Sequence, residues 1–236
     1  MNKLIVVTGG SKGIGRAVIE KFIFNGFDVV TCSRHMDGLQ QLETQLRTSF
    51  PQSKVFTLKA DLSDKLQVHT FCEFVKGLNR SVDVLVNNAG YFIPGQIVKE
   101  PDDTLTKMIE ANLYSAYYTT RGLIDLLKNG KSRYIFNMCS IASFMAYPNG
   151  GSYAISKFAL LGFSKCLREE LKAEGIRVSA VMPGATRTES WDGTSLPDER
   201  FISPQDVADA IFAAYSLSAR SVVEEIIIRP QLGDLK

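Results

Sequence analysis

The chain has 236 residues, of which 45% are hydrophobic and 22% are charged, and its formal net charge is +2. The length fits a single domain spanning residues 1–236, and the composition is typical of a globular protein with a large core. Charges of both signs are scattered, which argues against a nucleic-acid partner. No run approaches the roughly 20 apolar residues of a membrane span, so no membrane partner is expected.

Neither a metal site nor an export signal is predicted. The first residues lead straight into an apolar strand without a signal-peptide pattern, so a cytoplasmic location is expected. The four cysteines have no C-x-x-C spacing and do not cluster with the two histidines. We interpret them as reduced, mostly buried thiols.

A glycine-rich turn follows the first predicted strand, residues 4–7. The turn, Thr8–Gly15, reads T-G-x-x-x-G-x-G and leads into a helical pattern that stops at Asn25-Gly26. A strand, a glycine turn and a helix are the context that a dinucleotide-binding fingerprint requires. Its backbone N–H groups and helix N-terminus would hold a pyrophosphate, although a tight turn that binds nothing has the same form.

The second predicted strand, residues 28–32, ends at Ser33 and Arg34. The 2′-hydroxyl of NAD requires an acidic partner here, whereas the 2′-phosphate of NADP requires a cation. The chain offers Arg34 and, from the glycine turn, Lys12, while Asp37 comes three residues late. The charges therefore favour NADP(H), the alternative being that Arg34 is an ordinary solvated loop residue.

Two more predicted strands end in polar or small residues. Residues 54–60 lead to Asp61 and Leu62, and a helix then begins near Ser63. Residues 82–86 lead to the sequence Asn-Asn-Ala-Gly at 87–90. Such residues at the carboxyl end of a strand fit a ligand that approaches the backbone, although an ordinary turn also uses Asn and Gly.

Residues 101–128 carry a long helical pattern with Asn112 near its middle. Asparagine is a poor residue for a helix interior, so its position calls for a reason. An exposed or self-bonded side chain is the simplest alternative.

Ser140 follows the predicted strand 133–138, and the next helix, reaching about residue 174, carries Tyr153 and Lys157. A spacing of four residues puts both side chains on one helix face, about 5–6 Å apart at Cβ. A cation beside a phenol lowers a pKa that starts near 10. The pair is therefore suited to acid or base chemistry on an alcohol or carbonyl.

The chain ends in a strand over 177–182, a helix that Ser203 caps, and a strand over 225–229. Pro183, Gly184, Thr186 and Thr188 follow the first of these strands. Strands and helices alternate throughout, which predicts an α/β fold with a mostly parallel sheet.

Taken together, these motifs resemble the short-chain dehydrogenase/reductase family along essentially the full chain. The resemblance implies a doubly wound, Rossmann-type sheet of seven strands in the order 3-2-1-4-5-6-7, with helices on both faces. It also implies hydride transfer between nicotinamide and a carbonyl or secondary alcohol of a small substrate. The matching residues are Thr8, Gly9, Gly13, Ile14, Gly15, Asp61, Asn87, Asn88, Ala89, Gly90, Asn112, Ser140, Tyr153, Lys157, Pro183 and Gly184.

The resemblance also implies roles for four catalytic residues. Tyr153 would be the general acid in reduction, and Lys157 would lower its pKa and bind the nicotinamide ribose. Ser140 would orient the substrate oxygen. Asn112 would hold a water in a proton relay.

The residues expected to bind NADP(H) come from every motif. Besides Tyr153 and Lys157, they are Gly9, Ser11, Lys12, Gly13, Ile14, Gly15, Ser33, Arg34, Asp61, Leu62, Asn88, Ala89, Gly90, Pro183, Gly184, Thr186 and Thr188. Within the family pattern, Asp61 and Leu62 face the adenine, and the last four approach the nicotinamide amide.

Substrate and assembly are less sharply predicted. The segment 224–231 at the chain end looks more like members of the sepiapterin-reductase or hydroxy-acid dehydrogenase type than like ketoacyl-carrier-protein reductases. Aromatic residues expected near the site favour a small or planar carbonyl compound. A homodimer or homotetramer is expected through the helices 111–128 and that of Tyr153. The alternative function is a nucleotide-sensing, non-catalytic regulator on the same fold.

Overall fold

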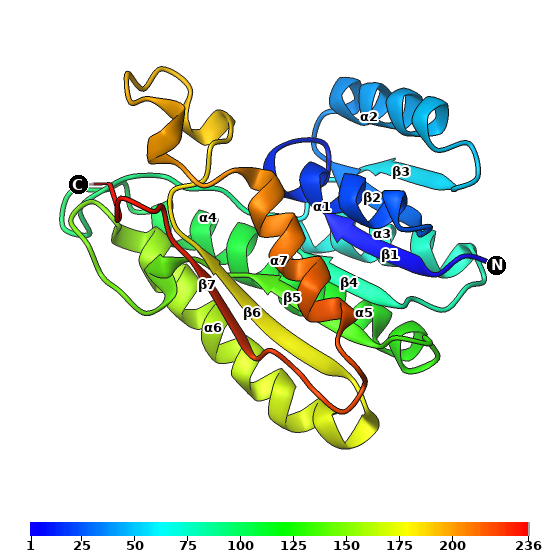
Figure 1. The fold of residues 1–236 in the computed structure, drawn as a ribbon. Helices are drawn as coiled ribbons and strands as arrows, with labels where there is room; N and C mark the ends of the chain where they lie inside the picture. Colours follow the sequence, from blue (N-terminus) through cyan, green and yellow to red (C-terminus); the bar gives the residue numbers. More distant parts are fainter. Residues whose placement is uncertain (236) are drawn as a thin grey trace.

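The computed structural model describes residues 1–235, and these contain one parallel sheet of seven strands (Figure 1). Residue 236, the last of the predicted domain, lies outside the described residues. The strand order is β3-β2-β1-β4-β5-β6-β7, which confirms the expected order. The strands are β1 (Leu4–Thr8), β2 (Asp28–Ser33), β3 (Val55–Lys59), β4 (Val84–Asn87), β5 (Tyr134–Met138), β6 (Arg177–Pro183) and β7 (Glu225–Ile228).

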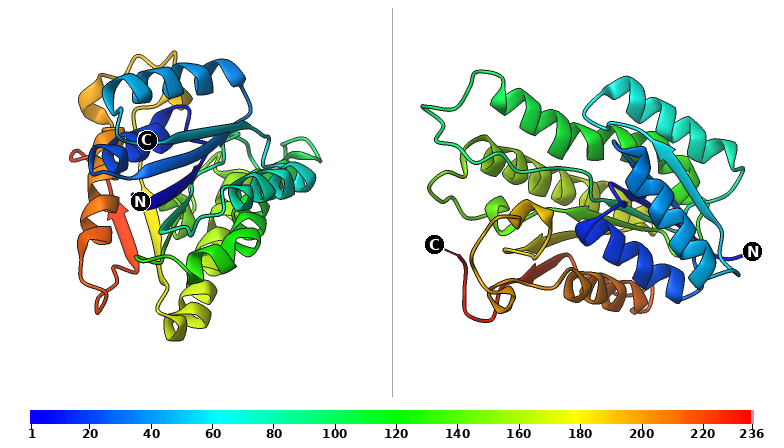
Figure 2. Two further views of the ribbon diagram at one scale, coloured as in Figure 1. Left: turned by 90° about the vertical axis from the view of Figure 1, so that its right-hand side faces the viewer. Right: turned by 90° about the horizontal axis from the view of Figure 1, so that it is seen from above.

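Helices cover both faces of the sheet, and the two views of Figure 2 show α7 on the face opposite α5 and α6. None of the helices within residues 1–235 is long and apolar enough to cross a membrane. The α-helices are α1 (Gly13–Phe24), α2 (Met36–Ser49), α3 (Lys65–Gly77), α4 (Thr104–Ile109), α5 (Ser115–Lys128), α6 (Gly151–Leu171) and α7 (Pro204–Ser216).

Alternating strand residues supply the two halves of the core. In β1, Ile5 and Val7 pack with residues of α1 and α7, while Leu4 and Val6 pack with residues of α3 and α5. All five residues of β1 are buried. Both faces of the sheet are therefore covered, which is why the strand reads as a continuous apolar run.

The helical pattern of residues 101–128 is not one regular helix. A π-helical turn, Glu110–Tyr114, separates α4 from α5 and contains Asn112. Single π-turns inside helices often occur at functional sites. The misplaced asparagine was the sequence signal for this interruption.

A buried ion pair lies at the amino end of β2. The predicted motifs follow the opposite, carboxyl ends of the strands. The Arg80 guanidinium lies 2.6 Å from the Asp28 carboxylate, and the two side chains are only 10% and 4% exposed. Asp28 also accepts a hydrogen bond from the Lys54 amide at 2.8 Å. Removing Arg80 would leave a buried carboxylate without its cation.

We therefore expect Arg80→Ala to lower the free energy of unfolding by about 3 kcal/mol, the cost of breaking a buried pair from one side. Chemical denaturation measures this value. Arg47→Ala is the matched control, because Arg47 pairs with Glu43 on the surface and is 63% exposed. The control should change stability by less than about 1 kcal/mol, and equal losses in the two variants would contradict the expectation.

Candidate active site

The carboxyl ends of β1 and β4 are joined by hydrogen bonds. The Thr8 hydroxyl accepts from the amides of Asn88 and Ala89, each at 2.9 Å. The Asn88 side chain donates to the carbonyl oxygens of Thr8 and Gly9 at 2.9 and 3.0 Å. These bonds bring two of the predicted cofactor motifs together at the carboxyl ends of two neighbouring strands in the middle of the sheet.

The glycine turn packs too closely for larger residues. A Cβ on Gly15 would lie 2.5 Å from the Asn88 side-chain nitrogen and 2.6 Å from the Gly9 carbonyl oxygen. Both distances are below ordinary contact, so this position requires glycine. The backbone of the turn therefore lies at the start of α1. A glycine turn at a helix N-terminus is the geometry that suits a pyrophosphate.

Two exposed cations flank the junction between the turn and β2. The Ser11 hydroxyl donates to Ser33 at 2.9 Å, so the next residues, Lys12 and Arg34, lie beside the same junction. Both are exposed, and the Arg34 guanidinium carbon lies 5.4 Å from the ring centre of Tyr91. This donor set fits the 2′-phosphate of NADP better than a 2′-hydroxyl.

Ser140 is oriented by its own local turn. It caps the short 3₁₀ helix Ile141–Ser143, and its hydroxyl oxygen accepts from the Ala142 amide at 3.1 Å. The Ser143 hydroxyl accepts from the Ser140 amide at the same distance. Because the Ser140 oxygen is used as an acceptor, its proton is free to donate toward the Tyr153 phenol. Ala142, whose amide donates within this turn, is fully buried.

Tyr153 and Lys157 lie together as expected, but the pKa of the phenol is not lowered. The Lys157 ammonium lies 5.7 Å from the Tyr153 ring centre and donates to the Met138 carbonyl oxygen at 2.7 Å. Burial raises the pKa of Tyr153 to about 12, and a hydrogen bond with Ser140 opposes this shift. Burial also lowers the pKa of Lys157 to about 8. Desolvation therefore dominates the pKa of both groups, and the lowering of the phenol pKa that the helical spacing predicts is not found.

Asn112 clamps the segment that follows β4. Its side-chain oxygen accepts from the Tyr91 amide at 2.9 Å, and its nitrogen donates to the Tyr91 carbonyl at 3.1 Å and to Ser156 at 2.9 Å. The side chain is 1% exposed. The amide is thus engaged with protein partners, and holding a water stays a prediction for this position.

Further predicted residues also follow the carboxyl ends of strands, here β3 and β6. The Asp61 carboxylate accepts from the Ser63 hydroxyl at 2.8 Å, and the buried Leu62 follows it. Pro183 ends β6, and the Thr186 hydroxyl donates to the Gly184 carbonyl at 3.0 Å.

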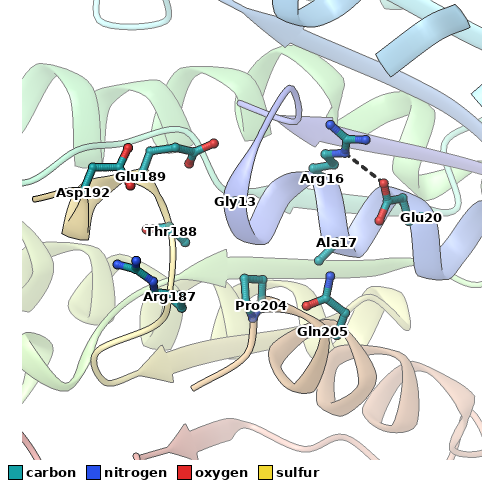
Figure 3. Close-up of a pocket in the computed structure, with 10 residues that line it drawn as sticks. All are labelled: Gly13, Arg16, Ala17, Glu20, Arg187, Thr188, Glu189, Asp192, Pro204 and Gln205. Carbon is teal, nitrogen blue, oxygen red and sulfur yellow. Dashed lines mark hydrogen bonds and ion pairs between the residues drawn. The ribbon is translucent and has the colours of Figure 1, made fainter. Parts of the chain in front are cut away.

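A cavity of about 320 Å³ opens between the glycine turn and the segment after β6 (Figure 3). Gly13 lines it from α1 and Thr188 from the later segment, and a Cβ on Gly13 would lie 3.2 Å from the Thr188 methyl group. Pro204 and Gln205 line it from the start of α7. Thr188 is thereby brought against the turn expected to hold the pyrophosphate.

The segment over residues 186–202 is held by contacts between its two ends and by contacts within it. Thr186 forms a β-bridge with Ile202, and Arg187 pairs with Asp198 at 2.8 Å. The ring centres of Trp191 and Phe201 lie 5.2 Å apart. Trp191 therefore packs within this segment.

One residue of the site had no assigned role in the sequence analysis, and another was missed entirely. Thr8 was named only as part of the glycine motif, although its position directly before Gly9 was a usable signal. Glu100 contacts Ser152 at the start of α6. These residues are 52 positions apart, and nothing in their sequence surroundings links them.

Residues 3–197 match the model of the family described as short chain dehydrogenase. A 3alpha-hydroxysteroid dehydrogenase from Mediterraneibacter gnavus is 32% identical over 96% of this chain and 94% of its own. A sepiapterin reductase from Chlorobaculum tepidum is 29% identical over 100% and 99% of the two chains.

Solved structures are similar over the whole chain. An alcohol dehydrogenase from Thermococcus sibiricus, complexed with 5-hydroxy-NADP, has a TM-score of 0.92 at 26% identity and covers 100% of both chains. L-sorbose reductase from Gluconobacter frateurii, complexed with NADPH and L-sorbose, has a TM-score of 0.88 at 27% identity over 100% and 97% of the chains. This chain therefore belongs to the short-chain dehydrogenase family, as its motifs predicted.

Proposed function

We propose that the protein is an NADP(H)-dependent oxidoreductase that interconverts a carbonyl and a secondary alcohol on a small substrate, with Tyr153 as general acid and base. The observation that carries this proposal is the convergence of Ser140, Tyr153 and Lys157: Ser140 is hydrogen-bonded to Tyr153, and the Lys157 ammonium lies 5.7 Å from the Tyr153 ring centre. A Cβ on Gly90, just after β4, would lie 3.8 Å from the same ammonium. NADP(H) is supported by the exposed cations Lys12 and Arg34 and by relatives solved with NADP-type cofactors.

Each side chain has a distinct task in reduction. When NADPH is bound, the hydride for the carbonyl carbon would come from its nicotinamide. The Tyr153 phenol donates its proton to the carbonyl oxygen, and the Ser140 hydroxyl holds that oxygen by a hydrogen bond. Positive charge on Lys157 favours the phenolate that remains and thereby assists the transfer. Asn112 holds the Tyr91 backbone and donates to the hydroxyl of Ser156, the residue before Lys157.

An aromatic rim supports a small or planar carbonyl substrate. Phe92 packs edge-on against Tyr153 with ring centres 4.8 Å apart. Phe92 and Tyr147, which also lies near enough to Tyr153 to raise its pKa, are both partly exposed. Such surfaces take up apolar or ring-shaped molecules and leave the polar oxygen to the hydroxyl donors.

Incubating the protein with NADPH and a panel of cyclic ketones, diketones and keto sugars tests this function. Loss of the nicotinamide absorbance with one or more of them is the expected result. Tight NADPH binding without turnover of any carbonyl or alcohol in the panel would instead favour a nucleotide-sensing protein.

The face formed by α5 and α6 supports assembly into a homodimer or homotetramer. Ile155 and Phe158 are exposed on α6, Tyr114 is exposed just before α5, and Tyr117 of α5 packs on Phe163 of α6. Burial of this face against a second copy removes large apolar side chains from water. Sedimentation velocity measures the resulting mass, and a monomer at micromolar concentration would contradict the proposal.

The pH dependence of carbonyl reduction should follow Lys157. Its pKa is lowered to about 8, whereas that of Tyr153 is raised to about 12. As pH rises through about 8, Lys157 loses its charge while Tyr153 keeps its proton, so kcat/KM for NADPH, which reports the free enzyme, should fall. The matched control is Lys157→Arg, which keeps its charge. If that variant loses activity over the same pH range, another group is responsible.

A further inference from the structure

The irregular segment between β4 and α4 contacts the amino-terminal part of α6, the helix that carries Tyr153 and Lys157, at several points. Near its beginning, Phe92 packs on the ring of Tyr153. In its middle, the Gly95 amide donates to the Asn149 carbonyl at 3.0 Å, just before α6. At its end, the Glu100 carboxylate reaches Ser152. The segment is therefore fitted to the amino-terminal end of α6.

The helix α6 has no cap of its own. Gly150 occupies the N-cap position without a side chain to accept a hydrogen bond, and the first turn holds no acidic residue. The first backbone amides of any helix lack partners within the helix, and negative charge is favourable there. Here the negative charge comes from Glu100, which lies 52 residues before Ser152 in the sequence.

Glu100 fills that role through Ser152. Its carboxylate accepts from the Ser152 amide at 3.4 Å and from the Ser152 hydroxyl. Ser152 is only 1% exposed, so the contact is shielded from water on its side. A hydrogen bond to a charged acceptor is stronger than one between neutral groups.

Gly151 makes room for this contact. Its φ is +39°, in the region that favours glycine. A Cβ there would lie 2.7 Å from the Glu100 carboxylate and 2.5 Å from the Gly95 carbonyl oxygen. The chain thus has a side-chain-free residue where the carboxylate passes to reach Ser152.

We propose that Glu100 is a positioning residue for the proposed general acid, acting through Ser152 to fix the start of α6 and the place of Tyr153. Ser152 directly precedes Tyr153, so a shift of the first turn moves the phenol relative to Ser140. The proposal rests on the proposed function of Tyr153. Misplacement of a reacting group by about 1 Å can cost as much as 10²-fold in rate.

Steady-state kinetics of Glu100→Gln, Ser152→Ala and the double variant test this role. Each single change should lower kcat about tenfold, an effect well within that range, and leave the Kd for NADPH within about twofold, because the glycine turn is untouched. The double variant should be no slower than the slower single one, since both changes remove the same contact. Asp103→Asn is the matched control, because Asp103 lies three residues away and forms an exposed pair with Lys107 at 2.6 Å. It should keep wild-type kinetics.

Three results would overturn the role of Glu100. They are an unchanged kcat in both single variants, a loss of NADPH affinity that matches the loss of kcat, and losses that multiply in the double variant. Thermal unfolding of each variant identifies a change that only loosens the fold. Failure of the proposed function is recognised separately, because the wild-type protein would then reduce no carbonyl in the panel.

Discussion

Replacing Tyr153 by phenylalanine is expected to lower kcat for carbonyl reduction by about 10²–10⁴-fold, the usual contribution of a general acid. The change removes one oxygen and leaves the ring. The edge-on contact with Phe92 involves the ring, so packing around the position should persist. The Kd for NADPH should stay within about twofold, because binding does not require the phenol proton.

Single-turnover absorbance measurements and fluorescence titration with NADPH check the two halves of this expectation. Tyr118→Phe is the matched control: the same oxygen is removed from α5, where the Tyr118 ring lies 4.8 Å from the Lys65 ammonium. The control should keep wild-type turnover. If Tyr153→Phe retains more than about a tenth of kcat, Tyr153 is not the general acid.

The elements of the fold followed closely from sequence patterns. Runs such as residues 4–7 are apolar without alternation because the sheet is covered on both faces, and Asn25-Gly26 marks the end of α1. The order of the seven strands required the family resemblance, since local patterns do not encode which strands pair. The π-turn around Asn112 was visible only as an unexplained asparagine inside a helical pattern.

The site was predicted less completely than the fold, because spacing along a helix fixes neighbours but not burial. Tyr153 and Lys157 are neighbours as predicted, yet desolvation raises the pKa of the first and lowers that of the second. Likewise, the contact of Glu100 with Ser152 joins an irregular segment to a distant helix. No periodicity or turn motif encodes such a contact.

The preference for NADPH is expected to reverse in Arg34→Asp. The variant removes a cation from the end of β2 and adds a carboxylate that can accept from the 2′-hydroxyl of NADH. Hydrogen bonds to charged groups contribute about 1.5–3 kcal/mol, and 1.4 kcal/mol corresponds to tenfold. The ratio of kcat/KM for NADPH to that for NADH should therefore fall by about 10²-fold.

Steady-state kinetics with both cofactors measure this ratio, and Lys12→Ala should lower it by a smaller factor, because it removes a cation without adding an acceptor. Arg220→Asp makes the same charge change on an exposed residue before β7 and should leave the ratio unchanged. A wild-type preference for NADH would contradict the assignment outright. An equal loss with both cofactors would place Arg34 in the fold of the turn rather than at the 2′-phosphate, because only a contact with that group distinguishes the two nucleotides.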